Sequence, residues 1–166
     1  KKEIIVGTGS FWSDFGEGGA IYIFDVTGSL IKSWKLDNDY RLFYSSPVLG
    51  DINGDGKLEI VHGAIQNTGR WKNSRIYAWN LDGSLVNGFP VDLQNRNLNE
   101  IDELSIPILV DTNEDNIEEI FVVSYQGKVY GIKGDGTFLA SWPKDIGSKL
   151  ILNLILSDID NVDGWW

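Results

Sequence analysis

Residues 45–61, SSPVLGDINGDGKLEIV, place an acidic, glycine-rich loop between two apolar runs. The loop spaces four oxygen-bearing side chains so that they can converge on one point: Asp51, Asn53, Asp55 and Glu59. Gly56 supplies the sharp turn between them, and the carbonyl of Lys57 offers a further oxygen. Oxygen-only ligands at this density suit a hard cation, and Ca²⁺ tolerates a flexible, mixed cage better than Mg²⁺ does. The stretch therefore predicts a strand, a calcium loop and a second strand.

Two alternatives to this calcium loop need to be considered. An EF-hand opens in the same way, but it requires a bidentate glutamate at loop position 12 and flanking helices. His62 stands at that position, so the EF-hand interpretation fails. The second alternative is an Asx-rich acidic turn that holds no ion, because aspartate and asparagine also bond to their own backbone.

The same unit recurs over residues 105–120, SIPILVDTNEDNIEEI, with serine, proline, aspartate, asparagine and glutamate at identical offsets. The expected ligands of this second loop are Asp111, Asn113, Asp115, Glu119 and the carbonyl of Ile117. Asn116 takes the turn position, and asparagine tolerates a left-handed backbone better than most residues other than glycine. A third copy begins at Asp158 but has Val162 where the third ligand should be. We therefore assign no complete site there.

The Asp-x-Asn-x-Asp-Gly-x-x-Glu loop with strands on both sides resembles the FG-GAP, or VCBS-type, repeats of integrin alpha-subunit propellers and of bacterial surface and secreted proteins. The resemblance covers nearly the whole chain and implies β-propeller blades that bind Ca²⁺. It does not indicate one activity, since the family includes adhesins, receptors and polysaccharide-degrading enzymes.

A second element repeats between the loops and reads as a β-hairpin each time. Its tyrosines, Tyr22, Tyr77 and Tyr130, recur at intervals of 55 and 53 residues, and each is followed by a glycine-containing turn. A period of this length with several strand signals is typical of propeller blades made of four antiparallel strands, A to D. The hairpins thus predict the same all-β fold as the loops.

We divide residues 1–166, a single segment, by this pattern. Strands B, C and D of a first blade are expected within 1–36, complete blades within 44–92 and 104–143, and the A strand of a further blade at the start of 150–166. Inner strands are expected near 44–51, 104–111 and 150–157. Because closed propellers have roughly four to eight blades, we expect an arc that belongs to a longer chain, or copies that complete one another's ring.

Composition restricts the partners. The formal charge is −10 over 166 residues, which argues against nucleic acid or an anionic membrane as partner. Cysteine is absent, and no apolar run is long enough to insert into a membrane. Weak calcium sites suit the calcium-rich space outside cells. We therefore expect an extracellular or cell-surface protein, and the missing initiator methionine and signal peptide suggest a mature or excised piece.

The B–C and D–A loops are long and aromatic-rich, and they share the face opposite the calcium loops. We expect this face to bind carbohydrate or an extracellular protein through ring stacking and planar hydrogen bonds. The candidate residues are Trp12, Tyr40, Arg41, Arg70, Trp71 and Arg96. The alternative is that these side chains fill gaps between blades.

The sequence favours a calcium-stabilised binding or adhesion module over an enzyme. No nucleophile-and-base pair is recognisable, and His62, the only histidine, has the position of a packed residue on a strand. We name no catalytic residue. The alternative is a propeller domain of a secreted polysaccharide lyase or hydrolase, which would need convergent acids or a base in a central funnel.

Overall fold

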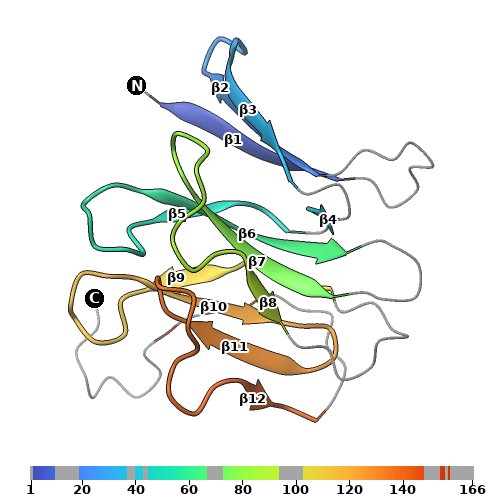
Figure 1. Ribbon diagram of the computed structural model, residues 1–166, viewed down its shortest axis with the longest axis vertical. Coiled ribbons are helices and arrows are strands. Elements are labelled where there is room, and N and C mark those ends of the chain that lie inside the picture. The colour runs from blue at the N-terminus through green and yellow to red at the C-terminus, as the bar shows by residue number, and fades with distance from the viewer. Residues whose placement is uncertain are drawn as a thin grey trace.

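The computed structural model describes residues 2–9, 19–36, 40–42, 45–66, 73–93, 103–147, 154–155 and 157. Every regular element within these ranges is a β-strand, and the strands form three antiparallel sheets (Figure 1). The sheets follow one another along the chain and along the long axis of the view in Figure 1. No helix long and apolar enough to cross a membrane occurs in the described part of the chain.

The first sheet is a meander of three strands, β1 (Glu3–Thr8), β2 (Ala20–Asp25) and β3 (Leu30–Lys35). β1 pairs with β2 over its whole length, from Glu3 opposite Asp25 to Thr8 opposite Ala20. The register between β2 and β3 shifts at Ile23, as a β-bulge produces. These are the strands expected as B, C and D within 1–36.

The second sheet is centred on β6 (Glu59–Gln66), which pairs with β7 (Ser74–Asn80). On its other side β6 pairs with two short strands, β5 (Val48–Gly50) and β4 (Tyr40–Arg41). β8 (Val91–Leu93) completes the sheet beside β7. The inner strand expected at 44–51 is thus only three residues long in β5, and the paired segment at 40–41 extends the same edge.

The third sheet repeats this order with β9 (Ile108–Val110), β10 (Glu119–Val123), β11 (Lys128–Ile132) and β12 (Lys144–Asp145). β9 is shorter than the strand expected over 104–111, although a bridge between Leu104 and Ser124 continues the pairing. The strand expected at 150–157 lies mostly outside the described residues. The structure describes three residues of that segment, Leu154, Ile155 and Ser157, and none of them belongs to a strand. The side chain of Ile155 is 89% exposed.

The three predicted hairpins are present, and their turns use the same bonds. The amide of Gly28 donates to the carbonyl of Asp25, and Gly83 and Gly136 make the equivalent bonds to Asn80 and Lys133. All three glycines have φ between 82° and 90°. A Cβ atom is strongly disfavoured at that φ, which explains why glycine closes each turn.

Two apolar clusters join the sheets face to face. One lies between the first and second sheets and includes Ile21 of β2 with Ile60 and Trp79. The other lies between the second and third sheets and includes Val61 with Ile120. β6 contributes to both clusters because successive side chains of a strand point to opposite faces. Its near-continuous burial follows from this position between two neighbours.

Candidate metal loops and the cleft between them

The first loop, residues 51–59, is a set of Asx turns. Both oxygens of Asp51 accept backbone bonds, from the amides of Gly54 at 2.7 Å and Gly56 at 2.8 Å. Asn53 Oδ1 accepts from the amide of Asp55 at 2.9 Å, and Asp55 Oδ1 accepts from the amide of Lys57 at 2.8 Å. These bonds hold the backbone of this strand-to-strand connection in a tight coil.

Glu59 differs from the other acidic residues of this loop because it is buried, with a 1% exposed side chain. Its carboxylate accepts from the amide of Ile52 at 3.2 Å. Burial raises the pKa of Glu59, and the negative charges of Asp55 and Asp51 raise it further. A buried carboxylate that two other carboxylates repel is a site that a cation would stabilise.

The second loop makes four equivalent bonds sixty residues later, whereas Asp111 Oδ1 accepts from the amides of Asn113 and Asp115. Asp111 Oδ2 accepts from the amide of Asn116 at 2.7 Å, Asn113 Oδ1 accepts from Asp115 at 3.0 Å, and Asp115 Oδ1 accepts from Ile117 at 2.8 Å. Glu119 accepts from the amide of Thr112 at 2.9 Å, as Glu59 does from Ile52. The predicted left-handed turn residue Asn116 has φ 64°.

The donor atoms suit a hard cation, since each loop offers two aspartates, one asparagine and one glutamate. Within the described residues, however, no three acidic or histidine side chains are gathered into a group that could hold a metal ion. The carboxylates instead accept backbone bonds, and the Lys57 ammonium lies 3.1 Å from Asp55 Oδ2. The loop backbones are thus formed, while the side chains would have to converge for a cation to bind.

The two loops contact each other, a feature that the sequence analysis did not identify. The amide of Glu118 donates to the carbonyl of Asp51 at 3.0 Å. Its carboxylate lies against Gly50, and burial, together with the charges of Asp51 and Asp111, raises its pKa. The sequence contains one indication of this contact, because Glu118 stands at the position that Leu58 has in the first loop.

The third hairpin reaches the first loop as well. A Cβ atom on Gly134 would lie 1.5 Å from the carbonyl oxygen of Ile52, so only glycine permits this approach. The equivalent hairpin residues, Val26 and Leu81, are 70% and 48% exposed and have room for their side chains. The second and third sheets therefore meet through backbone at this end of the molecule.

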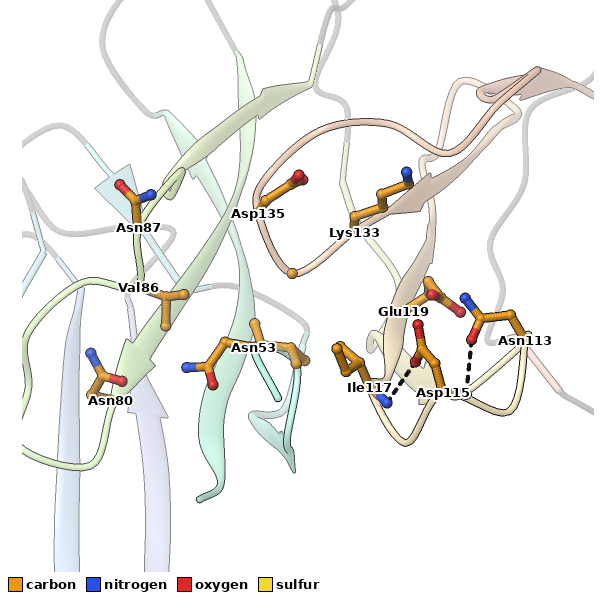
Figure 2. Close-up of a pocket in the computed structure, with 12 residues that line it drawn as sticks. Asn53, Asn80, Val86, Asn87, Asn113, Asp115, Ile117, Glu119, Lys133 and Asp135 are labelled. Atoms are coloured by element: carbon orange, nitrogen blue, oxygen red, sulfur yellow. Dashed lines mark hydrogen bonds between the residues drawn. The ribbon is translucent and has the colours of Figure 1, made fainter. Parts of the chain in front are cut away.

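A cleft of about 450 Å³ opens beside this contact (Figure 2). Four asparagines line it, Asn53, Asn80, Asn87 and Asn113. Its charged residues are Asp115, Glu119, Lys133 and Asp135. Its remaining residues are Ile52, Val86, Ile117 and Gly134. Figure 2 shows residues of the second sheet on one side, residues of the second loop on the other, and Lys133 and Asp135 above them.

The predicted ligand face is only partly described. Trp12, Arg70, Trp71 and Arg96 lie outside the described residues. Tyr40 and Arg41 were expected in an exposed loop, but they lie in β4 and are only 4% and 7% exposed.

The reason that Tyr40 is buried is its packing against the second sheet. Its ring meets that of Tyr77 edge-on, with centroids 6.0 Å apart. The guanidinium of Arg75 stacks 4.1 Å above the Tyr40 ring and is paired with Asp92. Tyr40 therefore belongs to the core cluster rather than to an exposed binding surface, which agrees with the gap-filling alternative.

His62 is fully buried on β6 between the first and second sheets. Its Nδ1–H donates to the carbonyl of Gly63 at 2.7 Å, while Nε2 has no hydrogen-bond partner among the described residues. A Cβ atom on Gly7 would lie 2.5 Å from Nε2, so β1 packs directly on the ring. Burial lowers the pKa of His62 to about 4, although the bond to Gly63 opposes that shift. The ring is a neutral packing residue at neutral pH.

Comparison with known proteins adds no relative to this description. No protein-family model matches the sequence, and no curated protein sequence is significantly similar to it.

Proposed function

We propose that this chain is part of a calcium-stabilised β-propeller that serves as a binding module of an extracellular or cell-surface protein. The FG-GAP-like loops, the repeated hairpins and the sequential antiparallel sheets support the propeller arrangement. Each sheet would be one blade, and the calcium loops would be the connections from β5 to β6 and from β9 to β10. Further blades of a longer chain, or copies of this one, would continue the arc.

The observation that supports calcium binding most strongly is the hydrogen-bond pattern that the two loops share. They differ at the turn position, Gly56 against Asn116, yet both adopt a left-handed backbone there, with φ 78° and 64°. Asparagine is less favourable than glycine in this conformation. A loop that keeps equivalent bonds despite that cost has a geometric requirement, and a bound cation would provide one.

Bound calcium would supply two positive charges to each loop. The side chains of Asp51, Asn53, Asp55 and Glu59 would hold one ion, and those of Asp111, Asn113, Asp115 and Glu119 the other. The backbone carbonyls of Lys57 and Ile117 would complete the two sets. Each ion would offset the repulsion among carboxylates and fix the connection between two strands, a structural rather than catalytic role.

A binding role follows from what such a scaffold presents. Rigid sheets hold loops, and loops on a rigid scaffold are the usual place for recognition. The proposed partner is a carbohydrate or an extracellular protein. The candidates for the B–C and D–A loop face are Trp12, Arg70, Trp71 and Arg96. Tyr40 and Arg41 are buried and therefore cannot contact a ligand on that face.

An array of glycans and extracellular-matrix proteins, probed with the chain in calcium and in EDTA, tests this function. We expect calcium-dependent binding that falls in the Trp12→Ala/Trp71→Ala variant. Full retention of binding in that variant would exclude the loop face. Turnover of a polysaccharide on the array would contradict the binding module and favour the lyase or hydrolase.

A further inference from the structure

We propose that the cleft between the second and third sheets is a binding site for a neutral saccharide. This site lies on the side of the molecule that bears the metal loops and the hairpin turns, not on the loop face discussed above. Its lining residues come from the two loops and from the second and third hairpins. The cleft volume of about 450 Å³ falls within the range of small-ligand sites, roughly 300–1,000 Å³.

The free hydrogen-bonding groups of the cleft include both donors and acceptors. Asn53 and Asn113 both use Oδ1 to accept an amide of their own loop. Within the described residues, their Nδ2 groups have no hydrogen-bond partner and remain available as donors. Asn80 is the reverse case, because its Nδ2 donates to Ser84 Oγ at 2.9 Å and leaves Oδ1 as an acceptor.

Two residues of the third hairpin add one group of each kind. Asp135 Oδ1 accepts from the amide and hydroxyl of Thr137, at 2.9 and 2.6 Å, which leaves Oδ2 as an acceptor. Lys133 supplies three ammonium donors beside it. Figure 2 also shows the amide of Asn53 directed toward that of Asn80. A hydroxyl group both donates and accepts, so a ligand with several hydroxyls can bond to the donors and to the acceptors of the cleft.

Charge distinguishes a neutral ligand from an ionic one. Outside the metal loops, Lys133 and Asp135 are the charged lining residues, and their charges balance. One lysine is too little for a polyanion, whose recognition uses clustered cations. Asp115 and Glu119 remain negatively charged although each accepts a bond within its own loop, and the calcium ion proposed for the second loop would offset their two charges. With that ion bound, the cleft favours a neutral polyol over a phosphate, an acidic glycan or a basic peptide.

The exposed apolar part of the cleft is small. Ile117 offers a partly exposed aliphatic group that suits the C–H face of a pyranose, whereas Ile52 is fully buried and Val86 is 5% exposed. Among the described residues, no tryptophan, tyrosine or arginine lines the cleft, so it lacks the anchors that dominate protein–protein hot spots, and hydrogen bonds rather than ring stacking would hold a saccharide. A folded protein partner would find no anchor here, whereas a short oligosaccharide would find hydrogen bonds around a small apolar floor.

The inference rests on the proposed calcium binding for its charge balance, because without the ion three carboxylates face one ammonium in the cleft. The hydrogen-bonding groups of the cleft do not depend on the ion. Asn80, Lys133 and Asp135 belong to hairpins, and the free amide donors of Asn53 and Asn113 are distinct from the oxygens assigned to a cation. Saccharide binding can therefore be measured both in calcium and in EDTA. A failure of the calcium proposal alone would leave the saccharide measurement interpretable.

Nuclear magnetic resonance with ¹⁵N-labelled protein tests the site, since it detects weak binding and locates it. The probes are cellotriose, mannotriose and maltotriose as neutral saccharides, pentalysine as a cation and a heparin-derived tetrasaccharide as an anion. We expect at least one neutral trisaccharide to shift the Gly134 backbone amide and the Asn53 and Asn113 side-chain amides.

A charge-conserving exchange is the decisive variant. Asn80 and Lys133 occupy the same position of successive hairpins, where each amide donates to the carbonyl four residues on. In Asn80→Lys/Lys133→Asn each hairpin receives a residue that the other already accepts, so net charge is kept and folding is expected. Binding should weaken about tenfold, because the acceptor of Asn80 and the long donor of Lys133 change places and no longer face the same groups of the ligand. Asp25→Asn, at the equivalent position of the first hairpin, is the matched control and should leave binding unchanged.

Three results would overturn the proposal. One is a response to pentalysine or to the heparin fragment without a response to any neutral saccharide. Another is neutral-saccharide binding that the exchange leaves unaltered or that shifts residues away from the cleft. The third is the absence of shifts with every probe. Melting curves confirm that each variant is folded, and Lys133→Ala provides a second reading should the exchange destabilise the protein.

Discussion

Acidification should destabilise the protein through His62, and replacing this residue by valine should remove the effect. His62 is neutral in the folded protein because burial lowers its pKa to about 4, against 6.5 for an ordinary histidine. A lowered histidine pKa means that the unfolded chain binds a proton more readily than the folded one. Stability is therefore complete above about pH 6.5 and is lost as the pH falls toward about 4.

The size of the effect follows from the two pKa values. When the pH falls from about 7.5 to about 4.5, His62 becomes protonated in nearly all unfolded chains but in few folded ones. Proton binding therefore stabilises the unfolded state much more than the folded state. The difference is about 2.5 kcal/mol, since one pKa unit corresponds to about 1.36 kcal/mol. Valine is a reasonable replacement because Val6 and Val122 stand at the equivalent positions, opposite Tyr22 and Tyr130 as His62 stands opposite Tyr77.

Urea unfolding of the wild type and of His62→Val at both pH values measures this contribution. The quantity compared is the pH dependence of the unfolding free energy, so a packing change that acts equally at both pH values cancels. We expect the wild type to lose about 2.5 kcal/mol more than the variant on acidification. Equal losses in the two proteins would refute the assignment of a buried neutral histidine.

Two further predictions concern the loops. Gly134→Ala should lower the free energy of unfolding by about 2–4 kcal/mol, because the new Cβ would collide with the Ile52 carbonyl. Gly147→Ala, whose Cβ would meet no other atom at φ 78°, should lower it by about 1–2 kcal/mol. Equal melting temperatures for these variants would show that the close contact is absent. Glu59→Gln should raise stability in EDTA by about 1 kcal/mol, because it removes a buried, repelled charge, and should lower stability relative to wild type in excess calcium. A variant that melts below wild type in both buffers would contradict the second prediction.

The repeated pattern of the sequence predicts local structure well because local structure depends on local chemistry. The hairpin turns follow from glycine at positive φ, as at Gly83, and the Asx loops follow from side chains that bond to their own backbone. Both features are decided within about ten residues of chain. Finding Asn116 in the left-handed conformation confirms that the second loop is equivalent to the first.

Features that arise between sheets were harder to predict. Tyr40 was expected to be exposed because it falls in a predicted D–A loop, but pairing of β4 with β6 and the stack under Arg75 bury it. The contact of Glu118 with Asp51 and the cleft near Gly134 join residues far apart in sequence. A periodic pattern contains no information on how tightly one repeat packs on the next, and such contacts depend on that packing.

Calcium binding by the metal-stripped chain is the measurement that tests the central claim most directly. Isothermal titration should give two calcium ions per chain, and one for Asp51→Asn, in which only the first loop is altered. At about 10 mM calcium, a site with a dissociation constant of about 10⁻⁴ M contributes about 2.7 kcal/mol, which raises the melting temperature by roughly 5–10 °C. Magnesium should give a smaller shift. A titration without binding heat, together with superimposable melts in calcium and in EDTA, would show that these loops are Asx turns that hold no metal.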